Sequence, residues 1–295
     1  MQITPIGPKF GAEIRGVTLK QVAADEGTYK DVRAAFEQHS VLVFRDQETD
    51  DEAQLAFTRK FGEPEMVPVG TAGMGGHFIT LSNFGKDGKV VAPDHRYALR
   101  NKANQLWHTD SSFKTTPALA SILSVRVSPA NGGGTEFVSM RRAFESFPKG
   151  LQERLENSFA WHNYAHSKSK IAKDLASQAE RDAFPPVCWR MVWRNPVNKR
   201  GALYLASHAC GVEGMAEQAG LAFIDELTDM ATQPGTTYEH AWKEGDVVMW
   251  DNRATMHRGR PWPGTEPRLM VRTTVSASAA DGLETMRPPR QQAAE

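Results

Sequence analysis

The chain has 295 residues, with 35 Lys and Arg against 35 Asp and Glu, so its formal net charge is zero. This balance excludes a dedicated nucleic-acid binder, because such proteins carry a marked basic excess. Hydrophobic residues make up 40% of the chain and charged residues 24%, which is typical of a globular protein and not of a disordered one. The two cysteines, Cys188 and Cys210, form no CxxC pattern, which excludes a disulfide scaffold and a cysteine zinc site.

The sequence also indicates where the protein works. Its first residues lack the basic start and apolar run of a secretion signal, and no stretch is apolar enough to span a membrane. Together with the sparse cysteines, these features predict a cytoplasmic protein in a reducing environment. We expect no nucleic-acid or membrane partner, and we expect a homo-oligomer.

Short apolar runs separated by Gly, Pro and Asn recur along the whole chain and predict strands. In chain order, the predicted elements are a helix at 31–39, a strand at 41–44, a helix from residue 49 or 50 to 61, strands at 77–82, 118–127 and 135–138, a helix at 141–157 with a break near Pro148, a strand at 203–205, a helix at 217–230, and strands at 246–250 and 269–275. The last helix is indicated by Leu221, Ile224 and Leu227 at helical spacing.

Three segments carry no clear periodicity. The Gly-rich, polar composition of residues 64–105 predicts a long loop or lid with one strand, and such long loops usually have a function. The charged residues of 166–183 predict an exposed surface segment, and the tail at about 280–295 is expected to be loose. No composition shift marks a boundary, so we expect a single domain over 1–295. Many strands with few helices predict a mainly β fold with helices (α+β), built as one sandwich or barrel.

One short pattern is suited to binding a metal ion. His108-Thr109-Asp110 places an imidazole and a carboxylate two residues apart, and on a strand both would face one side. Such a match also arises by chance in a chain with nine histidines. Two histidines and one carboxylate that leave open positions are typical of non-haem Fe(II) oxygenases. The candidates for the second histidine are His162, His166, His208, His240 and His257.

His257 is favoured by its surroundings, because it lies in the densest group of arginines in the chain. These are Arg253, Arg258, Arg260, Arg268 and Arg272. Guanidinium groups bind carboxylates through paired hydrogen bonds, so a metal centre beside them would attract an anionic chelating cosubstrate such as a 2-oxo acid. The alternative is that the first three of these arginines form surface salt bridges.

Four motifs in order carry a resemblance to a known family. They are NQLWHTDSSF at 104–113, GGGTEF at 132–137, MWDNR at 249–253 and HRGR at 257–260. Together they closely resemble the bacterial 2,4-dichlorophenoxyacetate/2-oxoglutarate dioxygenases, which share a superfamily with taurine dioxygenase. The resemblance covers most of the chain and implies a double-stranded β-helix, or jelly roll, as the core.

The resemblance also implies roles for individual residues around the metal. His108, Asp110 and His257 match the positions that hold Fe(II). Arg268 matches the residue that pairs with the distal carboxylate of the cosubstrate 2-oxoglutarate, and Thr135 matches the hydroxyl that assists it. O2 is the second cosubstrate that the resemblance implies.

The residues that the resemblance implies for substrate binding are Arg272, Asn83, Lys89 and His208. Arg272 would contact either the C1 carboxylate of 2-oxoglutarate or the acid group of the substrate. The other three have structural alternatives: a turn asparagine, an exposed lysine and a hydrogen-bonded histidine. The expected substrate is a small anionic aromatic molecule.

In the reaction that the resemblance implies, 2-oxoglutarate and O2 yield succinate and CO2 while a substrate carbon beside an ether oxygen is hydroxylated. The resulting hemiacetal breaks into a phenol and glyoxylate, or the matching 2-oxo acid. Within the superfamily, the alternative substrates are an alkyl sulfonate, a sulfate ester or another aromatic carboxylic acid. Outside it, the alternatives are a Zn²⁺ hydrolase and a jelly-roll binding module without catalysis.

Overall fold

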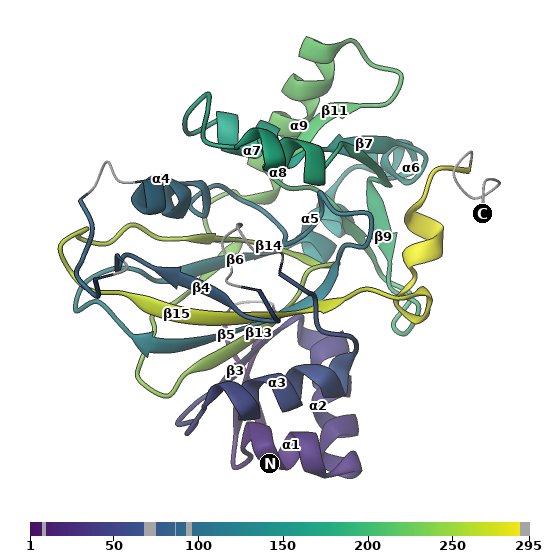
Figure 1. Cartoon of the computed structure of the whole chain (residues 1–295). Coiled ribbons are helices and arrows are strands. Elements are labelled where there is room, and N and C mark those ends of the chain that lie inside the picture. Colours follow the sequence, from purple (N-terminus) through teal and green to yellow (C-terminus); the bar gives the residue numbers. More distant parts are fainter. Residues whose placement is uncertain (8–9, 68–74, 86, 93–95, 290–295) are drawn as a thin grey trace.

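Two facing β-sheets form the centre of the computed structural model, which describes residues 1–7, 10–67, 75–85, 87–92 and 96–289 (Figure 1). The larger sheet has seven strands in the order β1 (Gln2–Pro5), β2 (Ala12–Arg15), β3 (Val41–Phe44), β13 (Val247–Asp251), β5 (Ala118–Val127), β15 (Leu269–Ser276) and β4 (Ile79–Ser82). The smaller sheet has the order β12 (Thr237–His240), β6 (Thr135–Ser139) and β14 (Thr255–Gly259). All neighbouring strands in both sheets are antiparallel except β2 and β3.

Apolar side chains from both sheets fill the space between them. Val43, Leu123 and Val248 from the larger sheet pack in one cluster with Phe137 of the smaller sheet and with Trp250. The rings of Phe137 and Trp250 lie 5.5 Å apart in an edge-to-face arrangement. This sandwich of antiparallel sheets confirms the expected jelly-roll core within a mixed α and β fold.

Helices cover the opposite face of the larger sheet. Residues of each strand alternate between the two faces, so every second side chain meets these helices. These helices are α1 (Leu19–Ala24), α2 (Glu26–His39) and α3 (Asp51–Phe61), drawn in purple and blue at the bottom of Figure 1. Leu42 and Phe44 point toward them, whereas Val43 points into the sandwich. The Asp50 side chain caps α3 by accepting a hydrogen bond from the backbone of Ala53 at 2.7 Å.

A long segment between β6 and β12 forms a second layer on the far side of the smaller sheet, at the top of Figure 1. Its elements are α5 (Met140–Ser146), α6 (Lys149–Glu156), β7 (Phe159–His162), α7 (Tyr164–Ser169), α8 (Gln178–Ala183), β8 (Val187–Arg190), β9 (Val192–Arg194), β10 (Gly201–Leu203), β11 (Ala209–Val212) and α9 (Glu217–Ala231). Its apolar residues, such as Leu155, Leu203 and Leu227, pack in one cluster with Val138 and Met256 of the smaller sheet.

The structure confirms most of the long apolar elements and corrects the polar ones. The strands at 41–44 and 118–127, the helix at 217–230 and the break at Pro148 are confirmed. The loop predicted over 64–105 contains, besides β4, the helix α4 (Arg96–Ala103), and its residues 68–74, 86 and 93–95 lie outside the described part of the chain. The segment 166–183, predicted to be exposed, is only partly so, because Leu175, Ala176 and Glu180 are buried. The strand predicted at 203–205 is β10, which ends at Leu203. The strands β1, β2, β7, β8, β9, β11, β12 and β14 and the helix α1 were not predicted.

The prediction of a loose tail is wrong for residues 279–286. They form two short 3-10 helices, η1 (Ala279–Asp281) and η2 (Leu283–Met286). Leu283 and Met286 are buried in the same cluster as Trp189 of β8 and Trp193 of β9, so apolar burial fixes this segment although it has too few residues for a periodic pattern. Among the described residues, no helix is long and apolar enough to cross a membrane.

The burial of Met286 predicts that the C-terminal segment contributes to stability. Met286→Ala should lower the free energy of unfolding by about 2–5 kcal/mol, because it leaves a cavity in a packed cluster. Ala280→Ser, at an exposed position of the same segment, is the matched control and should leave it unchanged. Urea denaturation of the two variants measures the difference, and equal midpoints would show that the segment is dispensable.

Candidate metal centre

His108 and His257 are brought together by the backbone of the chain. His108 N–H donates to the carbonyl of His257 at 3.0 Å, and His257 N–H donates to the carbonyl of His108 at 2.8 Å. This antiparallel bridge extends the smaller sheet by one residue next to β14 and sets the two imidazole rings 4.2 Å apart. The His257 ring also packs against Trp250, with 4.6 Å between ring centres, which restricts its orientation.

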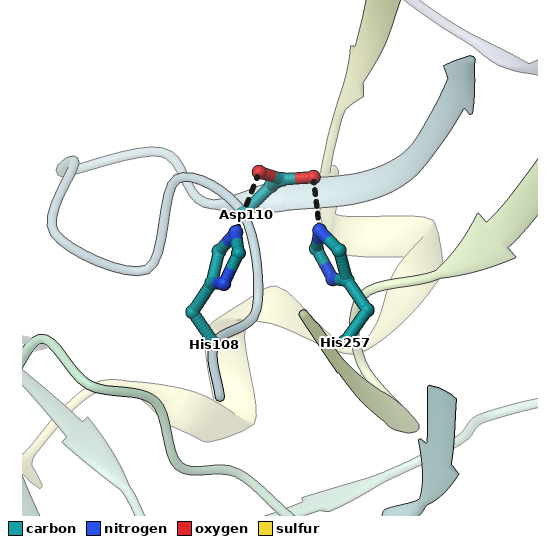
Figure 2. A group of neighbouring side chains, drawn as sticks. All are labelled: His108, Asp110 and His257. Carbon is teal, nitrogen blue, oxygen red and sulfur yellow. Dashed lines mark ion pairs between the residues drawn. The ribbon is translucent and has the colours of Figure 1, made fainter. Parts of the chain in front are cut away.

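Asp110 completes the group, with its carboxylate facing both rings (Figure 2). His257 Nε2 lies 3.6 Å from Asp110 Oδ2, and His108 Nε2 lies 3.9 Å from Asp110 Oδ1. The potential ligand atoms of the three residues all lie within 4.8 Å of one another. The expected triad is therefore assembled, although His108 and Asp110 lie on a bridge and the turn after it and not on one regular strand.

The protonation states of the triad suit a divalent metal ion. Burial lowers the pKa of His108 and lowers that of His257 well below its usual range, so both rings are neutral near pH 7. Burial by itself would raise the pKa of Asp110, but the Arg272 guanidinium and the hydrogen bond from Ser121 help to lower it overall, so the carboxylate is ionised. Two neutral imidazoles and one carboxylate with open positions form the donor set of non-haem Fe(II) oxygenases, so the residues fit this metal.

A small cavity lies against the metal triad on the side of β15. The residues that line it are Leu81, Asn101, Asn104, Gln105, His108, Leu123, Thr135, Trp250, His257, Gly259, Trp262, Arg268 and Arg272. The three residues expected to bind the cosubstrate, Thr135, Arg268 and Arg272, are thus all in its wall. Arg272 also forms an ion pair with Asp110 through its Nη1 atom.

Arg268 is a buried cation in this cavity. Its residue is 7% exposed, and among the described residues no carboxylate forms an ion pair with it. Its Nη2 donates to the carbonyl of Gly133 at 3.3 Å, its guanidinium lies 4.9 Å from the Trp262 ring centre, and its Nε has no partner. Burial lowers the pKa of Arg268 to about 10, which leaves it charged at neutral pH. A buried cation without a counter-charge is unfavourable, so an anion bound in the cavity would stabilise it.

Asn83 supports Arg268 by holding its backbone. Its amide nitrogen donates to the carbonyls of Gly264 and Glu266 at 3.2 Å and 2.8 Å, and its amide oxygen accepts from the N–H of Arg268 at 2.9 Å. The geometry therefore gives Asn83 a structural role, which differs from the expected substrate contact. Lys89 is exposed in a turn and does not line the described cavity.

Thr135 has a hydroxyl whose direction is set by a neighbour. The indole N–H of Trp242 donates to Thr135 Oγ1 at 3.0 Å. Because an indole N–H can only donate, the Thr135 oxygen is the acceptor, and its own hydrogen remains to donate to a ligand. Trp242 was not identified from the sequence, since no motif links it to the metal residues.

His208 lies on the other side of the metal triad, beside an aromatic cluster. Its ring centre is 6.3 Å from that of His108, and its Nδ1 is 3.2 Å from Ser112 Oγ. Phe113 packs against His208 with 4.7 Å between ring centres. Tyr164 and Phe184 lie 4.9 Å and 5.1 Å from Phe113, and the Lys168 ammonium lies 5.1 Å from the Tyr164 ring centre.

The arginine group around His257 divides between two roles. Arg268 and Arg272 line the cavity, whereas Arg258 and Arg260 pair with Glu136. Arg253 is buried in an ion pair with Asp251, so the salt-bridge alternative is confirmed for these three, although Arg253 is not on the surface. The other candidate ligands are elsewhere: His240 pairs with Asp246, and neither His162 nor His166 belongs to the triad.

Comparison with known proteins agrees with this geometry. A family model described as "Taurine catabolism dioxygenase TauD, TfdA family" matches residues 2–274. The alpha-ketoglutarate-dependent 2,4-dichlorophenoxyacetate dioxygenase of Burkholderia sp. (strain RASC) is 38% identical over 273 residues, covering 91% of this chain and 92% of the relative. The enzyme of the same name from Cupriavidus pinatubonensis is 37% identical over 276 residues, covering 92% and 96%.

A solved structure supports the fold and the site. The crystal structure of AAD-2 in complex with Mn(II) and N-oxalylglycine has a TM-score of 0.86 and 37% sequence identity, covering 94% of this chain and 98% of that one. The fold and the His-Asp-His centre define a 2-oxoglutarate-dependent non-haem iron dioxygenase. The chain belongs to the TauD/TfdA dioxygenase family.

The triad predicts that removal of one imidazole abolishes metal binding. His108→Ala should reduce Mn(II) affinity below detection, because two ligands cannot hold the ion at the affinity of three. His39→Ala makes the same chemical change on α2, away from the triad, and should bind Mn(II) as the unchanged protein does. Electron paramagnetic resonance of free Mn(II) during a titration measures both. Retained affinity in His108→Ala would contradict the ligand assignment.

Proposed function

We propose that the protein is an Fe(II)- and 2-oxoglutarate-dependent dioxygenase that hydroxylates aryloxyalkanoic acids next to the ether oxygen. The products are a phenol and glyoxylate, or the matching 2-oxo acid, together with succinate and CO2. The observation that carries the proposal is the buried, unpaired guanidinium of Arg268 in the cavity beside a neutral-His and carboxylate triad. The substrate class follows from the similarity to enzymes named for 2,4-dichlorophenoxyacetate.

The chain's own residues would bind and orient the cosubstrate. His108, Asp110 and His257 would hold Fe(II), which supplies the activation of O2. Arg268 would pair with the distal carboxylate of 2-oxoglutarate through charge-assisted hydrogen bonds, and the Thr135 hydroxyl would donate to the same carboxylate. A carboxylate bound in this cavity would also balance the charge of the Arg268 guanidinium, which burial otherwise destabilises.

The substrate would occupy the side of the triad that carries His208. The rings of Phe113, Tyr164 and Phe184 offer an apolar surface for an aryl group, and aromatic pairs of this kind favour offset or edge contacts. His208, with Ser112 on its Nδ1, would direct Nε2 as a hydrogen-bonding group to the substrate. Arg272 would provide a cation for a carboxylate of either the cosubstrate or the substrate.

The cytoplasmic location and the homo-oligomeric state of the protein stay predictions. Cys188 and Cys210 are both free thiols, in keeping with a reducing cytoplasm. The homo-oligomer is tested by size-exclusion chromatography with light scattering, which measures the molar mass of the protein in solution. The Zn²⁺ hydrolase and the non-catalytic module find no support, because the chain belongs to a dioxygenase family.

The proposal predicts a defined product balance. With 2,4-dichlorophenoxyacetate, Fe(II), 2-oxoglutarate and air, 2,4-dichlorophenol, glyoxylate and succinate should form in equal amounts. Taurine should give little sulfite in the same assay. Chromatography of the products measures both reactions, and dominant sulfite release or turnover without 2-oxoglutarate would overturn the proposal.

The role of Arg268 predicts a change in cosubstrate affinity. Arg268→Met should raise the 2-oxoglutarate concentration for half-maximal rate roughly 10- to 100-fold, because a hydrogen bond to a charged group contributes about 1.5–3 kcal/mol. Arg260→Met removes an arginine that pairs with Glu136 near the surface, so this control should not change that concentration. Initial rates at varied 2-oxoglutarate decide the matter. An unchanged value in Arg268→Met would assign the carboxylate to another residue.

A further inference from the structure

Asn252 is buried in the turn between β13 and β14, beside the metal triad but not part of it. Its Oδ1 accepts hydrogen bonds from the backbone N–H of Asp110 at 3.0 Å and from Trp250 Nε1 at 3.1 Å. Both of these groups can only donate, so the side-chain atom that faces them is the amide oxygen. The orientation of the Asn252 amide is therefore defined by its neighbours.

The nitrogen of this amide begins a directional chain of hydrogen bonds to the metal ligand. Asn252 Nδ2 donates to Ser121 Oγ at 3.0 Å, and Ser121 Oγ donates to Asp110 Oδ2 at 2.7 Å. A serine hydroxyl has one hydrogen, and here the amide occupies its acceptor side. The hydroxyl hydrogen is thus directed at the carboxylate.

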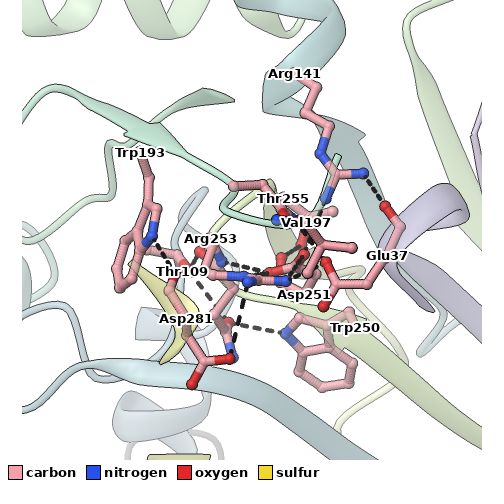
Figure 3. Close-up of polar contacts among 12 residues, drawn as sticks. Glu37, Thr109, Arg141, Trp193, Val197, Trp250, Asp251, Arg253, Thr255 and Asp281 are labelled. Atoms are coloured by element: carbon pink, nitrogen blue, oxygen red, sulfur yellow. Dashed lines mark hydrogen bonds and ion pairs between the residues drawn. The ribbon is translucent and has the colours of Figure 1, made fainter. Parts of the chain in front are cut away.

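Buried charges flank Asn252 in the sequence, and Figure 3 shows Asp251 and Arg253 close to Glu37 and Arg141. Asp251 and Arg253 are 0% and 1% exposed, and they pair with each other at 2.9 Å. Arg253 also pairs with Glu37 of α2 at 2.8 Å, and Asp251 pairs with Arg141 of α5 at 3.1 Å. Because separating a buried ion pair is strongly unfavourable, this cluster fixes the backbone from which the Asn252 side chain projects.

The peptide chain around the ligand is tied to the same turn. Thr109 Oγ1 donates to the carbonyl of Asn252 at 2.7 Å, and the Asn252 N–H donates to the carbonyl of Leu119 at 2.9 Å. One residue therefore contacts the backbone of Asp110, the residue before it and, through Ser121, the carboxylate itself. In the described structure, this carboxylate also pairs with Arg272, so its orientation depends on opposing contacts.

We propose that Asn252 is a positioning residue that acts through Ser121 to fix the Asp110 carboxylate for metal binding. The inference rests on the proposed function only in taking the triad as the metal site. It assigns Asn252 a role in the metal centre, whereas the neighbouring Asp251 and Arg253 hold the backbone of the turn in place. Hydrogen-bonding partners of metal ligands typically change metal affinity 10- to 100-fold when they are removed.

The test compares two buried serines of β5. Ser121→Ala deletes the donor to Asp110, whereas Ser124→Ala deletes a hydroxyl that donates to Gln54 Oε1 at 2.7 Å. Both serines are at most 1% exposed, so the two changes remove the same group from equally buried sites. Ser121→Ala should weaken Mn(II) binding roughly 10- to 100-fold, and Ser124→Ala should leave it unchanged. Thermal denaturation without metal checks that both variants are folded.

A second variant tests the amide. Asn252→Asp keeps the shape and the acceptor but replaces the donor to Ser121 with an oxygen, so it should also weaken Mn(II) binding. A Mn(II) affinity equal to that of the unchanged protein in folded Ser121→Ala would overturn the inference. Absence of Mn(II) binding in the unchanged protein would instead show that the triad is not a metal site, which would contradict the proposed function.

Discussion

The reciprocal backbone hydrogen bonds between His108 and His257 are the constraint on which the site depends. Each residue donates to and accepts from the other, so the two imidazoles are placed by the same kind of bond that builds the sheet. Loops can change around such a bridge without moving the rings. The cavity lined by Thr135, Arg268 and Arg272 and the aromatic cluster beside His208 both adjoin this fixed pair, so two separate groups of side chains are arranged around the same two rings.

Buried ion pairs are a second constraint on the site. Glu37, Arg141, Asp251 and Arg253 form a cluster with excellent hydrogen-bond geometry between α2, α5 and the end of β13. Buried ion pairs contribute little net stability compared with apolar packing, but they penalise any shift that separates the partners. Here they fix the position of the turn whose residue Asn252 accepts a hydrogen bond from the backbone of Asp110.

The sequence was most informative where a local pattern decides the structure. The apolar run at 118–127 became β5, and His108, Asp110 and His257 were placed together by motif resemblance. Polar helices such as α4 were missed, because their burial depends on partners distant in the sequence. The same reason hid Trp242 and Ser121, whose hydrogen bonds connect separate strands. Asn83 was expected to contact the substrate, but only the structure shows that its side-chain amide binds backbone groups.

The short helix η1 supplies a counter-charge to residues that lie far from it in the sequence. Asp281 Oδ1 lies 3.3 Å from Arg33 Nη2 and 3.9 Å from Arg253 Nη1, and its carbonyl accepts from Trp193 Nε1. These two cations therefore lack one of their counter-charges in any partly folded state in which η1 has not yet packed against α2 and the turn after β13. Docking of η1 therefore completes the charge balance around both arginines, and a chain without this aspartate would lack that partner.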